Sequence, residues 1–451
     1  MTGAVAPVLD FIHDIDPAAL PEDVVAHARR SLLDLIGVAA AGRLTDNSRI
    51  VRDCVARYEG AGRVGARMMF DGRRVSVAGA AMANAATIDA FDAHDGQKET
   101  KGHAGSVILP SLLALGDELA PSSGAEFLVR FVLGYELACR AGKALHATVH
   151  DYHTSGAWTA LAAAGVFARG LGLSRTATWH ALGAAEYYGP RSQMMRCIDH
   201  PTMVKDGATY GAQVGAMAGL LAEGGFTGAP AVTISDDAAA PFWSDLGTRW
   251  YMREQYLKPY GVCRWAQPAV KAALMLREGV DPSDIDRIEV RTFHEAVRLA
   301  VRRPQTTEEA QYSLPYPVAA AMATGDLLPE VVSGNLNDPA ILALVDRIVM
   351  SESDAANAAF PAERLAAMTL VMKDGSTRSC DLVSADGDPE TPLSDAAVDA
   401  KYRALAGATL APGAIEAIRE AALAVDGLDD AAMLTDRLLD PAGEKAFLTV
   451  A

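Results

Sequence analysis

The feature that most restricts the fold of this sequence is a series of Ala- and Gly-rich segments before residue 255, each with apolar residues at helical spacing. The segments cover residues 20–42, 76–90, 106–120, 122–145, 154–174, 174–189 and 207–228. Small side chains allow helices to approach one another closely, and Gly42 is placed to end the first helix as a C-cap. We therefore predict that residues 1–255 form a compact all-helical domain.

The character of the sequence changes after about residue 256. Residues 288–293 and 346–353 are short β-rich runs, and residues 365–383 read as a hairpin around the Asp374-Gly375 turn signal. From residue 393 the pattern is helical again. The expected fold is mainly α, with a smaller α+β lid domain over 256–392 and a helical segment, 393–451, that rejoins the first domain.

The charge balance limits the classes of partner. The chain has 451 residues and a formal net charge of -17, which argues against nucleic acid or an anionic membrane as a partner. A small anionic substrate remains compatible, because a local cationic pocket can form in an acidic protein. The five cysteines are scattered without CxxC spacing, and no apolar run is long enough to span a membrane. We expect a cytoplasmic protein.

One loop between two apolar helical segments concentrates titratable groups. Residues 91–110 contain Asp92, His94, Asp95, Lys98, Glu99, Lys101 and His103, separated by glycines. Such a cluster is typical of the edge of an active site, and a solvated surface loop is the alternative. P-loop, GxGxxG, GxSxG and kinase motifs are absent from the sequence, so the chemistry would depend on His, Asp, Lys and Tyr side chains.

Other segments carry candidates for the same site. His146, His150 and His153 are spaced at i, i+4 and i+7, so a zinc hydrolase is one alternative; His153 as a single titrating group before a helix is the simpler interpretation. Lys205 precedes a small-residue helix, whose N-terminus favours anions. Further candidates are Arg196, Lys258, Gln267 and Tyr316, although Tyr316 could also be a core residue with its hydroxyl bonded locally.

Several of these segments form an ordered set along the chain. They are DAHD at 92–95, GHAGSVILPSLLAL at 102–115, His153 ahead of an Ala-rich helix, VKDGATYGAQVGAMAGLLAEGGFTG at 204–228, KPYGVCRWAQP at 258–268 and AQYSLPYPVAAAM at 310–322. This set resembles the MmgE/PrpD family, which includes 2-methylcitrate dehydratase, cis-aconitate decarboxylase and iminodisuccinate epimerase. The resemblance covers nearly the whole chain.

The resemblance implies a fold and a set of roles. The family fold is an all-helical domain built from both chain ends with an inserted α+β lid, and members dimerise without a metal or organic cofactor. By resemblance, His103, His153, Lys205 and Tyr316 take the places of family motif residues, and Asp92 and Asp95 those of the family's D-(F/Y)-D-D. Two departures stand out: Gly96 or Gln97 replaces a Thr of decarboxylase-like members, and Gln267 replaces a His.

We predict a cofactor-independent lyase, nominally a dehydratase, that acts beside a carboxylate of a small di- or tricarboxylic acid. His103 and His153 would transfer protons, Lys205 would clamp a carboxylate, Asp92 would orient a histidine and Tyr316 would donate from the lid. Asp95, Lys98, Lys101, Arg196, Lys258 and Gln267 are the candidates for substrate binding. An epimerase of an amino- or imino-dicarboxylate, a decarboxylase of the cis-aconitate type and a non-catalytic carboxylate-binding homologue are the alternatives. We expect a homodimer.

Overall fold

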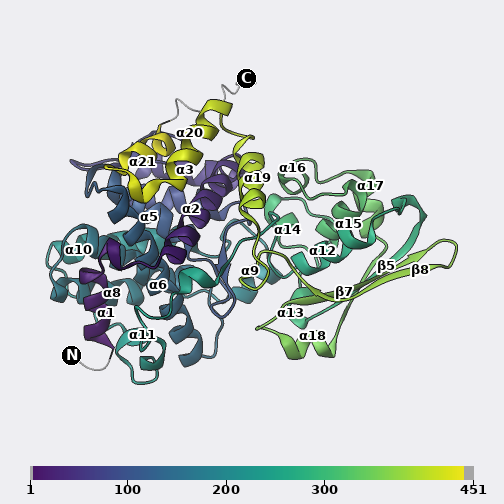
Figure 1. Cartoon of the computed structure of the whole chain (residues 1–451), viewed down its shortest axis with the longest axis horizontal. Coiled ribbons are helices and arrows are strands. Elements are labelled where there is room, and N and C mark those ends of the chain that lie inside the picture. Colours follow the sequence, from purple (N-terminus) through teal and green to yellow (C-terminus); the bar gives the residue numbers. More distant parts are fainter. Residues whose placement is uncertain (1–3, 441–451) are drawn as a thin grey trace.

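The computed structural model describes residues 4–440 and contains two lobes (Figure 1). The helical body comprises α1 (Val5–Asp14), α2 (Glu22–Gly42), α3 (Asp46–Tyr58), α4 (Val77–Asp89), α5 (Gly105–Glu118), α6 (Gly124–Thr148), α7 (Gly156–Gly170), α8 (Arg175–Tyr188), α9 (Met194–Asp199), α10 (Ala208–Glu223) and α11 (Val232–Ser235). The predicted helices therefore form. The mainly α fold class is confirmed.

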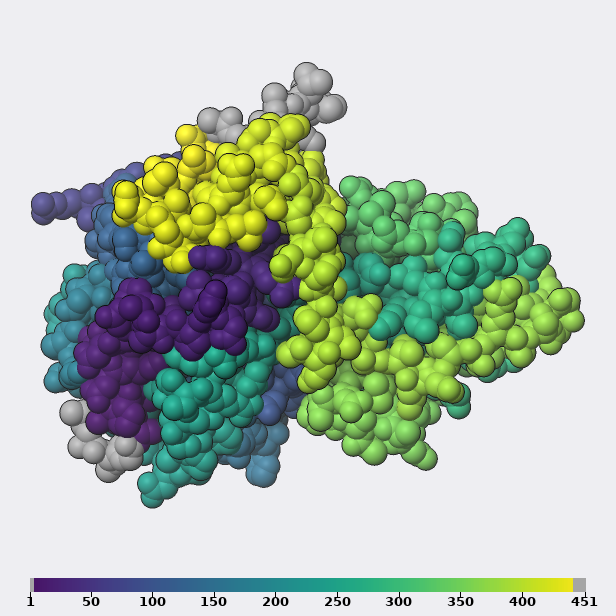
Figure 2. Space-filling model, in the orientation of Figure 1, coloured from purple at the N-terminus to yellow at the C-terminus, as the bar shows by residue number. Residues whose placement is uncertain are grey.

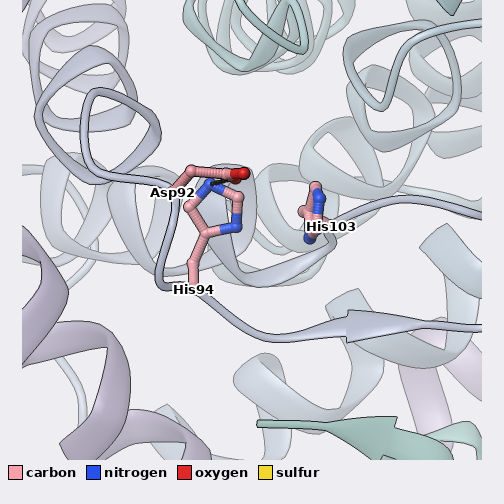
Figure 3. Close-up of side chains that lie close together, drawn as sticks. All are labelled: Asp92, His94 and His103. Atoms are coloured by element: carbon pink, nitrogen blue, oxygen red, sulfur yellow. Dashed lines mark ion pairs between the residues drawn. The ribbon is translucent and has the colours of Figure 1, made fainter. Parts of the chain in front are cut away.

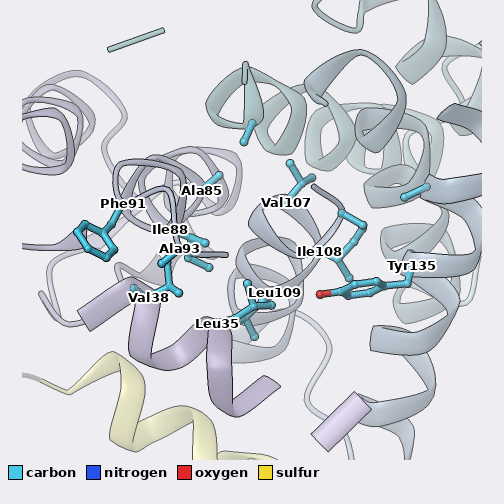
Figure 4. Close-up of a cluster of buried hydrophobic side chains, with 14 of the residues drawn as sticks. Leu35, Val38, Ala85, Ile88, Phe91, Ala93, Val107, Ile108, Leu109 and Tyr135 are labelled. Carbon is cyan, nitrogen blue, oxygen red and sulfur yellow. The ribbon is translucent and has the colours of Figure 1, made fainter. Parts of the chain in front are cut away.

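The body is held together by close packing of its small residues. Side chains of α2, α4, α5 and α6 meet in the buried core drawn in Figure 4. Gly42 lies inside the last turn of α2, and Arg43 is the C-cap residue, so the predicted capping role of Gly42 is wrong. A Cβ atom at Gly42 would lie 1.9 Å from the carbonyl oxygen of Thr87 in α4. The glycine is thus required for the close approach of α2 and α4.

The C-terminal lobe contains a four-stranded sheet in the order β6-β5-β7-β8. Strand β5 (Ile285–Thr292) pairs in parallel with β6 (Ile348–Glu352) and antiparallel with β7 (Leu365–Met372), which forms a hairpin with β8 (Thr377–Ser384). Gly375 has a φ of 85°, as the predicted Asp-Gly turn requires. The helices of this lobe are α12 (Gln267–Leu276), α13 (His294–Val297), α14 (Thr307–Gln311), α15 (Pro315–Thr324), α16 (Pro329–Ser333), α17 (Pro339–Val345) and α18 (Asp354–Ala359).

The last helices return to the helical body. Helix α19 (Asp395–Ala406) packs against α2, and α20 (Pro412–Leu423) contacts both α2 and α21 (Ala432–Leu439). In Figure 2 the yellow-green segment that leads into α19 covers the junction of the two lobes on this face. This arrangement agrees with a body built from both chain ends, whereas the predicted boundaries at 255 and 392 stay predictions.

A short ribbon connects the two lobes near the titratable loop. Strand β3 (Gly96–Gln97) pairs antiparallel with β4 (Gln255–Tyr256), which immediately precedes the C-terminal lobe. A second two-stranded ribbon, β1 (Ala66–Arg67) with β2 (Arg74–Val75), lies within the helical body. Among residues 4–440, no helix combines the length and apolar character needed to span a membrane.

Candidate active site

The loop between α4 and α5 is buried. Asp92, His94 and Asp95 are at most 1 % exposed and His103 is 8 % exposed, so the surface-loop alternative is wrong. The loop is covered by the β3–β4 ribbon, in which Gly96 pairs with Tyr256. The ribbon and the C-terminal lobe therefore turn a polar loop into an interior site, and each charge in it requires a partner.

Asp92, His94 and His103 meet in a compact cluster (Figure 3). His94 Nε2 lies 3.5 Å from Asp92 Oδ1 and 3.4 Å from Asp89 Oδ1, and the His94 and His103 rings pack edge to face with centroids 4.3 Å apart. Burial, together with the ammonium of Lys258, holds the pKa of both histidines well below its usual range. Both imidazoles are therefore neutral at neutral pH and can act as proton acceptors.

A backbone carbonyl fixes the tautomer of His103. Its Nδ1 atom lies 2.5 Å from the carbonyl oxygen of Asp95. A carbonyl can only accept, so Nδ1 carries the proton and Nε2 keeps its lone pair. The Asp95 carboxylate accepts a hydrogen bond from the Tyr135 hydroxyl on α6, and burial raises the pKa of Asp95 to about 7. The Asp95 backbone thus positions His103, and the role of the Asp95 side chain in substrate binding stays a prediction.

Asp206 faces the free nitrogen of His103. Asp206 Oδ2 lies 3.6 Å from His103 Nε2. Ser155 links the two residues, because it accepts from the backbone N–H of His103 at 2.9 Å and donates to Asp206 Oδ2 at 2.7 Å. Burial raises the pKa of Asp206, and the carboxylate of Asp89 raises it further. A neutral base and a carboxyl group that holds its proton more tightly than usual therefore lie side by side.

Lys205 is held by a strained backbone. Its φ is 45°, in the left-handed region that non-glycine residues seldom adopt, and it lies just before the first turn of α10. The side chain is 1 % exposed, and its Nζ donates to Gln311 Oε1 at 2.6 Å and lies 4.8 Å from the centroid of the Tyr312 ring. The strain is typical of a functional position, and the ammonium is available as a buried cation.

Lys258 supplies a second buried cation. Its Nζ donates to Asp92 Oδ1 at 2.8 Å and to the Asp92 carbonyl at 3.2 Å. Burial disfavours the ionised carboxyl, but Lys258 and then Lys205 hold the pKa of Asp92 well below its usual range. Asp92 is therefore ionised, and it orients both Lys258 and His94.

The cluster has the residue types of a metal site but the wrong charge environment. Ligand atoms of Asp92, His94 and His103 lie within 4.8 Å of one another. However, Asp92 Oδ1 already binds the Lys258 ammonium and Nδ1 of His103 faces a carbonyl. The ammonium groups of Lys258 and Lys205, whose charges act on Asp92, would repel a divalent ion. The group suits an anionic carboxylate better than a metal ion.

The alternative zinc site at His146, His150 and His153 is wrong. Helix α6 ends at Thr148, so the three histidines do not share one helix face, and His150 is exposed. The ring of His153 stacks on that of His146, with centroids 6.5 Å apart, and its backbone N–H donates to His146 Nε2. His153 lies two residues before Ser155, and its Nδ1 is buried without a protein partner in the described chain. Its pairing with His103 in proton transfer stays a prediction.

Tyr316 does not point its hydroxyl at the cluster. The Tyr316 hydroxyl donates to the carbonyl oxygen of Val331 at 3.0 Å, and burial raises its pKa to about 12. The contacts thus match a core tyrosine and correct the prediction of a donor from the lid. Tyr312, beside Lys205, and Tyr256, whose ring centroid is 6.4 Å from that of His103, lie at the site instead.

The remaining predicted binding residues are dispersed. Gln267 uses its amide within a turn, donating to the carbonyls of Tyr260 and Val262 and accepting from Arg264, which corrects its predicted contact with substrate. Arg196 is exposed on α9. The role of Arg196 in substrate binding stays a prediction.

Two lysines of the loop lie at the junction of the lobes. Lys98 pairs with Asp388 at 3.2 Å and Glu390 at 2.8 Å. Lys101 has a φ of 52° and holds its ammonium 4.3 Å from the centroid of the Tyr152 ring. Both remain candidates for substrate binding.

Sequence reasoning missed several members of the site. Asp206 follows Lys205 directly, Ser155 follows His153 by two positions, and Gln311 is the second residue of the segment 310–322 that contains Tyr316. The sequence around each of these three residues gives little indication of a functional role, because a single Asp, Ser or Gln near a helix end is usually a surface or capping residue. Only the fold shows that all three face the loop.

Comparison with known proteins matches both parts of the chain to one family. The model for the MmgE/PrpD N-terminal domain matches residues 8–244, and that for the MmgE/PrpD C-terminal domain matches residues 260–426. Cis-aconitate decarboxylase of Aspergillus terreus is 23% identical over 489 residues, covering 98% of this chain and 96% of that protein. Human cis-aconitate decarboxylase is 22% identical over 466 residues, covering 95% of this chain and 93% of that protein.

Proposed function

Because the chain belongs to the MmgE/PrpD family, we propose that it is a lyase that acts beside a carboxylate of a small di- or tricarboxylic acid. The observation that carries this proposal is the cluster itself: a neutral histidine of fixed tautomer, a carboxyl of raised pKa and two buried ammonium groups. This set can bind an anion and move a proton in the same enclosed space.

The first step is proton abstraction from the carbon beside the carboxylate. His103 Nε2 is the base, because the Asp95 carbonyl leaves it with the free lone pair. The developing enediolate carries negative charge on its oxygens, and Lys205, with Lys258 behind Asp92, is placed to stabilise it. The residues that orient these groups, Gln311 and Ser155, are buried, so the arrangement is preorganised.

Loss of water is the reaction that we favour. A leaving hydroxide requires a proton donor, and Asp206 is a carboxyl group whose pKa is raised by burial and by Asp89. In this reaction the proton of the C–H bond passes to His103, the electron pair forms the double bond, the C–O bond breaks and the Asp206 proton completes the departing water.

Decarboxylation is the second candidate. The curated relatives named above are cis-aconitate decarboxylases, and they match almost the full chain. In that reaction the C–C bond to the carboxylate breaks, carbon dioxide leaves and the resulting carbanion takes the proton of Asp206. The proposed assembly is a cytoplasmic homodimer that uses no cofactor.

Proton NMR of the protein with a panel of acids tests the proposal. The panel contains 2-methylcitrate, citrate, cis-aconitate and substituted succinates including iminodisuccinate. Loss of water from one member supports the dehydratase, and loss of carbon dioxide supports the second candidate. Stereochemical inversion without loss of water or carbon dioxide, or no reaction with any member, would overturn the assignment as this class of lyase.

A further inference from the structure

Arg364 brings an unpaired cation into the junction of the two lobes. It directly precedes β7 and is 4 % exposed. Its Nη2 donates to the carbonyl of Lys98 in the active-site loop at 3.0 Å, whereas Nε and Nη1 are buried without a hydrogen-bond partner in residues 4–440. A buried donor of a charged group that makes no hydrogen bond lowers stability, so Nε and Nη1 of Arg364 indicate that a ligand or bound water accepts from them.

The guanidinium lies within reach of the cluster. Its Cζ atom is 5.9 Å from the centroid of the Tyr256 ring, and that ring is 6.4 Å from the ring of His103. Tyr256 also pairs with Gly96 in the β3–β4 ribbon. Arg364 therefore contacts the ribbon and the loop that hold the base, although it comes from the C-terminal lobe.

The surrounding charges leave Arg364 unmatched. Arg264 pairs with Asp388 at 2.6 Å, and Lys98 pairs with both Asp388 and Glu390. Arg364 has no carboxylate partner within the described chain, which is unusual in a protein whose net charge is -17. This group of side chains thus contains one more cation than carboxylates. A bound anion would neutralise the remaining charge of Arg364.

We propose that Arg364 binds a further, non-reacting carboxylate that tricarboxylic acids have and dicarboxylic acids lack, and that it thereby selects tricarboxylic over dicarboxylic acids. This inference rests on the proposed function, since it assigns a further contact to the same site. Lys205 would bind the carboxylate beside the reacting carbon, and Arg364 would bind a distal one through its unpartnered Nη1–H groups. Its position on the C-terminal lobe means that a polycarboxylate would be held by both lobes.

Calorimetric titration with two unreactive acids tests the proposal. Tricarballylate and glutarate share a three-carbon chain and differ by one carboxylate. We expect the wild-type protein to bind tricarballylate more tightly, and R364Q to weaken tricarballylate about 10- to 100-fold with little change for glutarate. R364K, which keeps the charge, should restore part of the loss. R303Q removes an exposed cation of the same lobe, paired with Asp346, and should change neither affinity.

The two proposals fail in different ways. Unchanged tricarballylate affinity in R364Q, with a large loss in K205M, would overturn the role of Arg364 and leave the proposed function standing. Unchanged affinity in both variants, or no binding by the wild-type protein, would overturn both. Equal loss of both acids in R364Q would also contradict the proposal, since it would assign a general rather than a selective role.

Discussion

At the scale of single residues, the protonation states at the site follow from one contact and from burial. The Asp95 carbonyl keeps Nδ1 of His103 protonated, and burial keeps Asp206 a weaker acid than an exposed aspartate. Ser155 donates to Asp206 and favours its ionised form, but burial and the Asp89 carboxylate outweigh this contact. His103 thus has a free lone pair and Asp206 holds its proton more tightly, which is the division of roles that an elimination requires.

The acid role of Asp206 predicts a pH dependence. The acid must be protonated, so kcat should fall as pH rises through the elevated pKa of Asp206. D206N has no carboxyl proton to donate, and we expect its kcat to be about 100-fold lower. Its kcat should also lack the fall at high pH, the alkaline limb of the profile. S155A removes a hydrogen bond to the carboxylate and should shift the limb to higher pH. A D206N profile that keeps the wild-type limb would contradict the assignment.

Gly96 is a second residue on which the site depends. A Cβ atom there would lie 2.5 Å from the Tyr256 hydroxyl oxygen and 2.8 Å from His103 Nδ1. We expect G96A to lower kcat/KM at least about 10-fold and to destabilise the fold by about 1–3 kcal/mol, because ring and ribbon must move apart. G116A is the control: the added Cβ on helix α5 meets open space and should stabilise slightly. Kinetics and thermal unfolding measure both effects.

At the scale of elements, α19 connects the C-terminal helices to the active-site loop. Lys401 on α19 donates to the carbonyl of Ala93 at 2.7 Å and pairs with the buried Asp34 of α2 at 2.6 Å. One side chain thus fixes α19, α2 and the loop relative to one another. The helix does not reach the substrate in this account, and its contribution is to position the loop.

This contact predicts a coupled stability effect. K401M leaves Asp34 as a buried charge without its partner, and we expect a loss of about 3–5 kcal/mol in the free energy of unfolding. The double variant D34N/K401M should recover much of that loss, because the unpaired charge is gone. Denaturant unfolding measures both variants. Independent, additive losses would show that the two side chains do not act as a pair.

Several elements could be predicted from sequence for physical reasons. Apolar residues at helical spacing in Ala- and Gly-rich segments predict helices. An Asp-Gly pair between two strand-like runs predicts the turn of the β7–β8 hairpin. The loop at 91–110 combines so many titratable groups that the sequence alone indicates a candidate site there. The role of Gly42 could not be predicted from its own segment. A glycine is required there because the backbone of Thr87, 45 residues away in sequence, approaches it closely.

At the scale of the whole molecule, the site exists because two lobes close on one loop. Gln311 and Arg364 come from the C-terminal lobe, yet Gln311 contacts Lys205 and the Asp92 backbone, and Arg364 contacts Lys98. Such contacts depend on packing between distant segments, which no spacing within one segment encodes. For the same reason Tyr316 was predicted at the site while Tyr312, four residues earlier, is the tyrosine beside Lys205.

The central claim is that His103, through Nε2, moves the proton at the carbon beside a carboxylate. The most direct measurement is proton NMR in D2O with the reacting acid, comparing wild type with H103Q for loss of that C–H signal or entry of deuterium. We expect H103Q to slow this exchange at least about 100-fold, while circular dichroism and the unfolding midpoint stay close to wild type. Exchange at the wild-type rate in folded H103Q would contradict this claim and assign the base to another residue.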